Sequence, residues 1–193
     1  YTMTTLEELG LLKMDFLGLR NLTVIDDAEK EIRKTEPDFD IAKVPQDDPE
    51  TFRMLTEGRT CGVFQLESAG ITAVCTGLRP QSIEDMTAIV ALYRPGPMDS
   101  IPKFIAAKHD PASIRYRTPL LKPILSVTYG CMVYQEQVIE IFRQLGGYTL
   151  AQADNMRRAI SKKKQDVIVS ERRAFVYGDE TRGICGAVAN GVA

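Results

Sequence analysis

The stretch Tyr148–Lys164, YTLAQADNMRRAISKKK, decides how the rest of this 193-residue sequence is interpreted. Gly146 and Gly147 precede it, and glycine readily adopts the left-handed backbone with which many helices end. Thr149 is followed three residues later by Gln152, which is the pattern of a capping box. The sequence therefore predicts that one helix ends at the two glycines and that a new helix begins at Thr149.

At about 100° per residue, the new helix would carry a narrow apolar stripe beside a basic arc. The stripe consists of Ala153, Met156, Ile160 and Val167, and the arc of Arg157, Arg158, Ser161, Lys162 and Lys164, with Lys163 apart. Clustered guanidinium and ammonium groups are suited to bind phosphate oxygens. A solvated helix face, with Asp154 and Arg158 as an ordinary i, i+4 ion pair, is the alternative that this stretch leaves open.

The overall composition indicates a globular chain, with a formal net charge of −2 and 44% hydrophobic residues. The charges are unevenly distributed. Residues 26–57 contain eleven acids and five bases, whereas residues 141–173 contain eight bases and three acids. This asymmetry predicts an acidic surface in one region and an anion-binding surface in another.

Four cysteines lie far apart in the sequence, and His109 is the only histidine. This spacing argues against a zinc site and against a disulfide framework, and favours reduced thiols in a cytoplasmic protein. The sequence has no secretory signal and no apolar run of about 18 residues, so we expect no membrane contact. Because it lacks a starting Met and stops within small residues, we expect a fragment of a longer protein.

The apolar run Leu9–Phe16, LGLLKMDF, is typical of a short buried strand. Lys13 and Asp15 would project from the same face of that strand. They are either a structural ion pair or a metal-binding carboxylate beside a phosphate-facing ammonium. Helices are expected over residues 20–34, 49–57, 67–76, 82–93, 99–108, 120–125, 133–145 and 166–178.

Three further segments carry candidate binding residues. Gln65 and Ser68 lie where a helix N-terminus could offer polar groups to an anion, although this signal is weak alone. Arg94 precedes the rigid Pro95-Gly96-Pro97 turn, where it could reach a ligand or clamp the end of a helix. Four polar residues gather at the start of the amphipathic helix predicted for residues 133–145: Tyr134, Gln135, Glu136 and Gln137.

Five stretches of the chain together resemble the alpha subunits of bacterial DNA polymerase III, the C-family replicative polymerases. They are LKMDFLGLRNL (12–22), GVFQLES (62–68), ALYRPGPM (91–98), TYGCMVYQEQV (128–138) and GGYTLAQADNMRRAISKKK (146–164). The resemblance covers essentially the whole chain and implies a mainly α (α+β) fold. Residues 1–36 would be the end of a polymerase beta-like nucleotidyltransferase palm, with a short strand and a helix. Residues 37–193 would be a helical fingers domain, incomplete at its C-terminus.

The resemblance also implies roles for individual residues. Asp15 matches the third of three catalytic aspartates that hold two Mg²⁺ ions, and Lys13 would lie near the incoming triphosphate. Arg157 and Arg158 match the arginines that neutralise the triphosphate, and Lys162 to Lys164 would extend this basic surface. The segments expected to line the pocket of the nascent base pair contribute Gln65, Ser68, Arg94, Pro95, Tyr134 and Gln135.

The implied activity of the parent protein is template-directed addition of deoxynucleotides to a primer 3′ end, with primer–template DNA and deoxynucleoside triphosphates as partners. The P-D-x-D motif with the other two aspartates does not occur here, so we expect the fragment alone to be inactive. The regions that bind the sliding clamp, the clamp loader and the proofreading exonuclease are also absent. The implied location is the bacterial cytoplasm, near the nucleoid, and an unpaired strand could cause self-association. The alternative is a non-catalytic helical module that binds nucleic acid or protein.

Overall fold

The computed structural model describes residues 1–191, which belong to two compact units. The first unit spans residues 1–45, and the second begins at Gln46. The domain boundary expected at residues 36/37 falls inside the first unit, in the turn that follows its longer helix.

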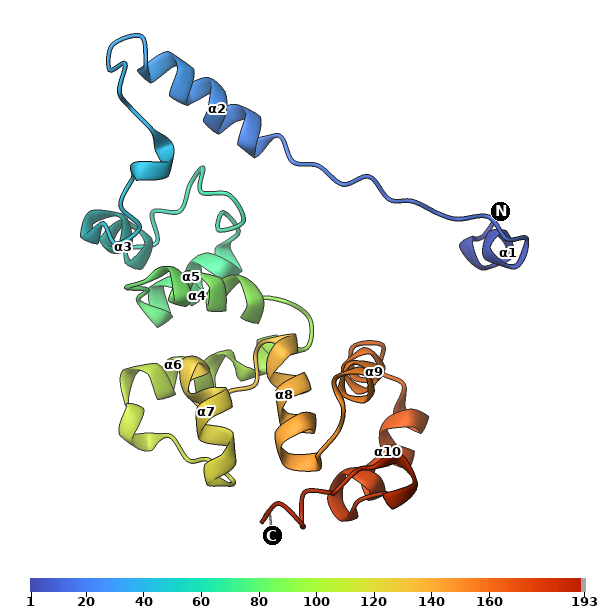
Figure 1. Cartoon of the computed structure of the whole chain (residues 1–193). Helices are drawn as coiled ribbons and strands as arrows, with labels where there is room; N and C mark the ends of the chain where they lie inside the picture. Colours follow the sequence, from blue (N-terminus) through green and yellow to red (C-terminus); the bar gives the residue numbers. More distant parts are fainter. Residues whose placement is uncertain (192–193) are drawn as a thin grey trace. The chain divides into compact units, whose positions relative to one another are not determined.

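The first unit contains two helices joined by an extended segment. They are α1 (Met3–Glu8) and α2 (Asn21–Ile32), followed by the single 3₁₀ turn η1 (Ile41–Lys43). Figure 1 shows the link between α1 and α2 as an irregular trace. None of these elements contains a buried residue. The first unit therefore has no hydrophobic core of its own.

The strand expected for Leu9–Phe16 is wrong. The described part of the chain forms no β-strand, and its only bridge joins Asp179 to Ile184. A strand needs a neighbour to accept its backbone hydrogen bonds, and the described residues offer none to this segment. Its apolar side chains are accordingly exposed, with Leu12 at 83% and Phe16 at 91%. The observed fold is mainly helical, as predicted, but without the minor sheet.

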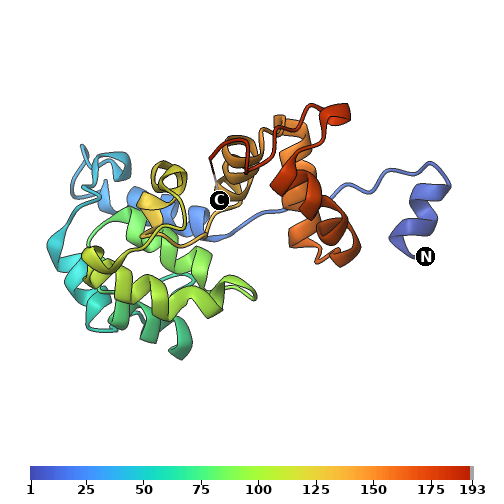
Figure 2. The same ribbon diagram turned by 90° about the horizontal axis from the view of Figure 1, so that it is seen from below.

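The second unit is a helical array with short 3₁₀ turns between its helices (Figures 1 and 2). Its α-helices are α3 (Pro49–Thr56), α4 (Ala69–Leu78), α5 (Ile83–Leu92), α6 (Ile101–His109), α7 (Lys122–Leu125), α8 (Gln135–Gly146), α9 (Leu150–Ser161) and α10 (Gln165–Tyr177). Its 3₁₀ turns are η2 (Pro97–Ser100), η3 (Pro111–Ser113), η4 (Pro119–Leu121), η5 (Ser126–Thr128) and η6 (Glu180–Arg182). None of the described helices is long and apolar enough to cross a membrane.

Three cores hold this unit together, and the smallest of them joins Ile124 and Leu125 of α7 to Leu145 of α8 and to Ala187. The first lies among α3 to α6 and includes the fully buried Leu78, Ile89 and Phe104. The second lies among α8, α9 and α10 and includes Tyr148 and Met156. Both views in Figures 1 and 2 place α8, α9 and α10 next to one another, in agreement with the shared core.

The helix junction predicted at the two glycines is confirmed. Gly147 has a φ of 74° and donates its N–H to the carbonyl of Arg143, which ends α8. Thr149 then begins α9: its N–H donates to Gln152 Oε1 at 2.8 Å, and its hydroxyl accepts from the Gln152 N–H. The capping box therefore satisfies two backbone N–H groups, that of Thr149 at one end of the motif and that of Gln152 at the other.

The predicted apolar stripe of α9 is only partly correct. Ala153 and Met156 are buried, but the third buried position is Ala159, while Ile160 is 36% exposed. Val167 belongs to α10 because α9 ends at Ser161. A spacing of about 100° per residue holds only within one helix, so it does not place Val167 on the same stripe as the residues of α9.

A partly buried ionic cluster ties α10 and the segment before α9 to the turn η6. Glu171 accepts hydrogen bonds from the Tyr148 hydroxyl at 2.9 Å and from two nitrogens of Arg182 at 2.6 and 3.0 Å. Hydrogen bonding from Arg182, followed by that from Tyr148, lowers the pKa of Glu171. A carboxylate with a lowered pKa stabilises the fold above its unfolded-state pKa and loses this contribution as the pH falls through its folded-state pKa.

Replacing Glu171→Gln should lower the free energy of unfolding at neutral pH by about 1–3 kcal/mol, because charge-assisted hydrogen bonds to a nearly buried carboxylate are lost. The difference from the wild type should shrink as the pH falls below the ordinary Glu range. Denaturant unfolding at several pH values measures this. Glu180→Gln is the control, since Glu180 is exposed and forms no ion pair with a described residue. A deficit that is independent of pH would contradict the assignment.

Candidate functional site

The second unit contains a cleft of about 1040 Å³ between α5, the turn before α6, the start of α8 and the end of α9. Much of its wall is apolar and includes Met86, Val90, Met132 and Ile160. The polar groups on the cleft come from three separate segments: Thr87, Arg94 and Ser100; Tyr134, Gln135 and Glu136; and Ser161 with Lys163. The fold thus brings together residues that lie up to about 80 positions apart in the sequence.

Arg94 reaches this cleft from the turn that ends α5. Its N–H donates to the carbonyl of Leu92 at 2.8 Å, and its carbonyl accepts from Met98 at 3.2 Å, so the backbone on both sides is held. Gly96, with a φ of 110°, allows the sharp change of direction into η2. The Arg94 side chain is exposed and has no ion pair or hydrogen bond with a described residue. Its positive charge is therefore available to a ligand.

Tyr134 and Gln135 are held in place by the buried side chain of Gln137. The Gln137 Oε1 atom accepts from the N–H groups of Val133 and Tyr134 at 2.8 and 2.9 Å. Its Nε2 atom donates to the carbonyl of Ile124 at 3.1 Å and to the Thr128 hydroxyl at 2.7 Å. The side-chain amide of Gln137 therefore makes all four of its possible hydrogen bonds, two as acceptor and two as donor. These bonds fix the irregular segment before α8.

Burial raises the pKa of Tyr134, and the nearby Glu84 and Asp85 carboxylates raise it further. The phenol therefore stays protonated at neutral pH. On the cleft wall it offers a neutral aromatic surface and a hydroxyl that can donate or accept.

Replacing Gln137→Leu should lower the free energy of unfolding by about 2–4 kcal/mol, because the N–H groups of Val133 and Tyr134 and the carbonyl of Ile124 lose this partner. Denaturant unfolding measures the loss. Gln144→Leu on the same helix is the matched control: Gln144 is exposed and bonds only to Glu140, so its replacement should change stability by no more than about 0.5 kcal/mol. Equal effects of the two replacements would show that the Gln137 network adds nothing to stability.

The two arginines of α9 are not free in this structure. Arg157 donates from Nε and Nη2 to Asp154 Oδ1, at 2.9 and 2.7 Å, and from Nη1 to Gln135 Oε1 at 2.9 Å. Arg158 Nε lies 2.8 Å from Asp154 Oδ2. The ion pair between Asp154 and Arg158 that was considered as the structural alternative is therefore present. Arg157 additionally joins α9 to the cleft residue Gln135.

The three lysines after α9 do not continue the helix. Lys162 is the C-cap, and Lys163 has a left-handed φ of 52°. The N–H groups of Lys163 and Lys164 donate to the carbonyls of Ile160 and Ala159, which is a Schellman motif with lysine where glycine is usual. The prediction that Lys162 and Lys164 share one helical arc with Arg157 and Arg158 is therefore wrong, because the helix ends at Ser161. It is Lys163, placed apart by the prediction, that lines the cleft.

Replacing Lys163→Gly should raise the free energy of unfolding by about 0.5–1 kcal/mol, because glycine relieves the left-handed strain at a small entropic cost. Lys162→Gly is the control, since Lys162 has an ordinary φ of −87° and glycine there should destabilise by about 0.5 kcal/mol. Chemical denaturation of both variants measures the difference. If glycine destabilised the protein equally at both positions, the backbone of Lys163 would not be strained.

Gln65 and Ser68 lie outside the residues that line the cleft. Gln65 is exposed with a left-handed φ of 66°, and Ser68 is the N-cap of α4 without a side-chain capping bond. The start of α4 is nevertheless linked to the Arg94 turn, because a Cβ on Gly70 would stand 1.9 Å from the Tyr93 hydroxyl. Glycine at position 70 thus allows Tyr93 to pack directly onto the helix.

Lys13 and Asp15 lie in the first unit, on the extended segment between α1 and α2. Lys13 Nζ is 3.4 Å from Asp15 Oδ1, and the two side chains are 51% and 66% exposed. No group of three or more His, Cys, Asp or Glu side chains that could hold a metal ion occurs among residues 1–191. Mg²⁺ prefers six oxygen ligands. Asp15 can supply one of them, but the described residues do not by themselves fit a two-ion site.

The fold and the cleft together define a helical domain whose apolar groove is flanked by cations without an ion pair among residues 1–191. The chain belongs to the family of the bacterial DNA polymerase III alpha subunit finger domain, whose model matches residues 21–183. The sequence prediction of this family is thereby confirmed.

Relatives named DNA polymerase III subunit alpha match almost the whole chain. The protein of Borreliella burgdorferi is 50% identical over 190 residues, which cover 98% of this chain and 17% of the relative. The protein of Thermus aquaticus is 48% identical over 198 residues, with 98% and 16% covered. That of Staphylococcus aureus strain MRSA252 is 45% identical over 184 residues, with 95% and 17% covered. The chain spans about a sixth of the length of these relatives.

Proposed function

We propose that this chain is the fingers part of a DNA-directed DNA polymerase and that its cleft binds the incoming deoxynucleoside triphosphate. The observation that carries the proposal is the convergence of Arg94, Tyr134, Gln135 and Lys163 on one groove from three segments. The family membership points to the same parent activity.

The chemistry of the groove suits such a ligand. A nucleobase is flat and largely apolar on its faces, and the wall offers it Met86, Val90, Ile160 and the neutral ring of Tyr134. A triphosphate is strongly anionic, and Arg94 and Lys163 form no ion pair with a described carboxylate, while Glu136 is the one acidic residue on the groove. Arg158, with a side chain 64% exposed, would add a further cation beside the groove, and Lys162 and Lys164 would extend the basic surface.

In the parent protein, Asp15 would contribute one carboxylate to a two-magnesium site whose other ligands come from outside this chain, and Lys13 would face the triphosphate. Bound magnesium would supply Lewis-acid stabilisation of the phosphoryl transfer. The cations of the fingers would hold the triphosphate and neutralise the charge that develops on the leaving pyrophosphate. Because only one of the ligands is here, we propose that the isolated chain does not synthesise DNA.

Primer–template DNA would be the second ligand of the parent protein, and Gln65 and Ser68 would contact the nascent base pair from the start of α4. The clamp, the clamp loader and the proofreading exonuclease would bind other regions of the longer protein. We place that protein in the bacterial cytoplasm.

Replacing Arg94→Ala in this chain should weaken binding of a deoxynucleoside triphosphate about five- to tenfold, the loss expected for one charge-assisted contact. Calorimetric titration measures the dissociation constant. Arg117→Ala is the matched control, because Arg117 is also exposed, forms no ion pair with a described residue and does not line the cleft. Equal losses in both variants, or an affinity unaffected by Arg157→Ala with Arg158→Ala, would remove the basis of the proposed site.

The alternative is a module that binds nucleic acid only through charge. Lys162, Lys164, Arg172 and Arg173 are exposed and form no ion pair with a described residue, which favours some binding of this kind. Such binding falls steeply with salt and does not depend on Arg94 or on the shape of the groove. Titration of both the wild type and Arg94→Ala at two salt concentrations therefore distinguishes the two functions, since only binding in the groove depends on Arg94.

A further inference from the structure

The carboxylate of Asp154 lies between the two arginines of α9 in the position of an anionic ligand. One of its oxygens accepts two bonds from Arg157, and the other lies 2.8 Å from Arg158. Guanidinium groups make the same forked contacts with carboxylates as with phosphates. The carboxylate of Asp154 thus neutralises part of the positive charge of Arg157 and Arg158.

The two arginines differ in how firmly they are held. Arg157 is 22% exposed and uses three of its nitrogens, two towards Asp154 and one towards Gln135. Arg158 is 64% exposed, and only its Nε approaches a described acceptor. An arriving phosphate would therefore meet Arg158 first and would compete with Asp154 for the guanidinium groups.

We propose that Asp154 is an internal counter-ion that a ligand phosphate displaces, and that it thereby sets the anion affinity of α9. Asp154 is a positioning residue and need not touch the ligand. This inference rests on the proposed function, since it takes the arginines to be part of the phosphate-binding surface. It adds a residue whose charge opposes binding.

The ionisation of Asp154 is consistent with this role. Hydrogen bonding from Arg157, assisted by the charges of Arg157 and Arg158, lowers the pKa of Asp154. The carboxylate is therefore charged throughout the neutral range and competes with phosphate at every pH at which the protein would act. No other carboxylate among the described residues forms an ion pair with either arginine.

The opposite role for the same contact is preorganisation. If Asp154 only held the arginines in the correct orientation for a ligand, removing its charge would loosen them and weaken binding. Displacement and preorganisation thus predict opposite signs for one measurement.

The experiment is calorimetric titration of the chain with inorganic tripolyphosphate at moderate ionic strength, where screening suppresses distant charges. Asp154→Asn should bind about three- to tenfold more tightly than the wild type, as expected for the release of two partly exposed ion pairs. Asp154→Ala should tighten binding similarly, and its high helix propensity protects the fold of α9. Circular dichroism checks that both variants are folded.

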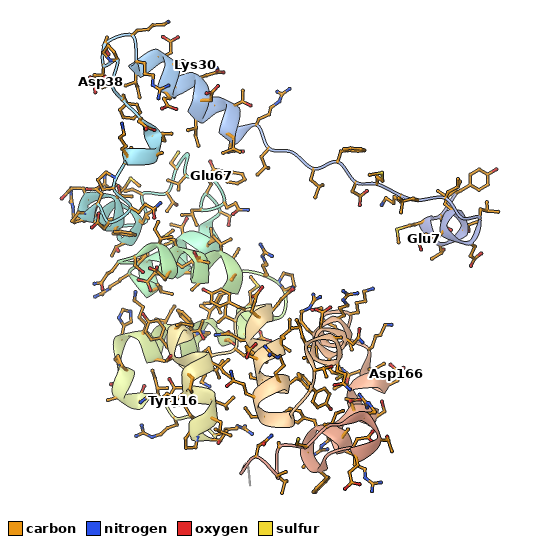
Figure 3. All side chains as sticks on the ribbon, viewed as in Figure 1. Glu7, Lys30, Asp38, Glu67, Tyr116 and Asp166 are labelled. Carbon is orange, nitrogen blue, oxygen red and sulfur yellow. The ribbon has the colours of Figure 1, made fainter. Side chains whose placement is uncertain are left out.

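Asp166→Asn is the matched control. It makes the same change of net charge, and Asp166 (labelled in Figure 3) stands in the first turn of α10. It forms no ion pair with a described residue. Its affinity for tripolyphosphate should change less than about 1.5-fold. Equal tightening by Asp166→Asn and Asp154→Asn would assign the effect to net charge and overturn the proposal.

Arg158→Gln distinguishes the inference from the function on which it rests. If Arg158→Gln weakens tripolyphosphate binding and both Asp154 variants tighten it, the counter-ion stands. If Arg158→Gln weakens binding but neither Asp154 variant tightens it, only the counter-ion is overturned. If Arg158→Gln changes nothing, the phosphate-binding surface itself fails, and the counter-ion fails with it.

Discussion

The cleft depends above all on the buried amide of Gln137. Residues 124–134 form no long helix, and an irregular segment beside a core would leave polar backbone groups without partners. The Gln137 side chain supplies two acceptor and two donor bonds to that segment, so a single residue of α8 satisfies it. Thr128 extends the hydrogen-bond network, because its hydroxyl accepts from Gln137 and donates to the Cys131 carbonyl at 2.6 Å. Tyr134 and Gln135 take their positions on the groove from this network.

Two residues with a left-handed backbone conformation end two of the helices that form the groove. Gly147 ends α8 and turns the chain into α9, which runs back so that its last turn reaches the groove. Lys163 ends α9 in the same conformation but carries a side chain and a charge. Glycine would be less strained there. Unfavourable backbone conformations of this kind often occur at binding sites, which agrees with the proposed role of the Lys163 ammonium group.

The parts that sequence reasoning predicted are those determined over a few residues. The capping box at Thr149 and Gln152 depends on spacing alone, and so does the proline-bounded turn after Arg94. The strand at residues 9–16 failed because its stability depends on a partner strand, which no local pattern supplies. Gln137 was noticed only as one of the polar residues at the start of its helix, and its buried role was not predicted, because a glutamine in an amphipathic helix resembles a solvent-facing residue until the segment packed against it is known. Lys163 was misplaced because the projection assumed a helix beyond Ser161.

The cations of the α9 region also cannot be ranked from sequence, since their availability depends on their acceptors. Arg157 and Arg158 attract notice as a pair, yet one carboxylate three and four residues earlier engages both. Arg94 and Lys163 are isolated in the sequence, yet they have no described counter-ion and share one groove. Under the proposed function, a phosphate would gain more from the two solitary cations before any rearrangement, and it would gain from the paired arginines only as far as Asp154 is displaced. Electrostatic attraction to the groove and release of the internal ion pair would then be separate steps of one binding event.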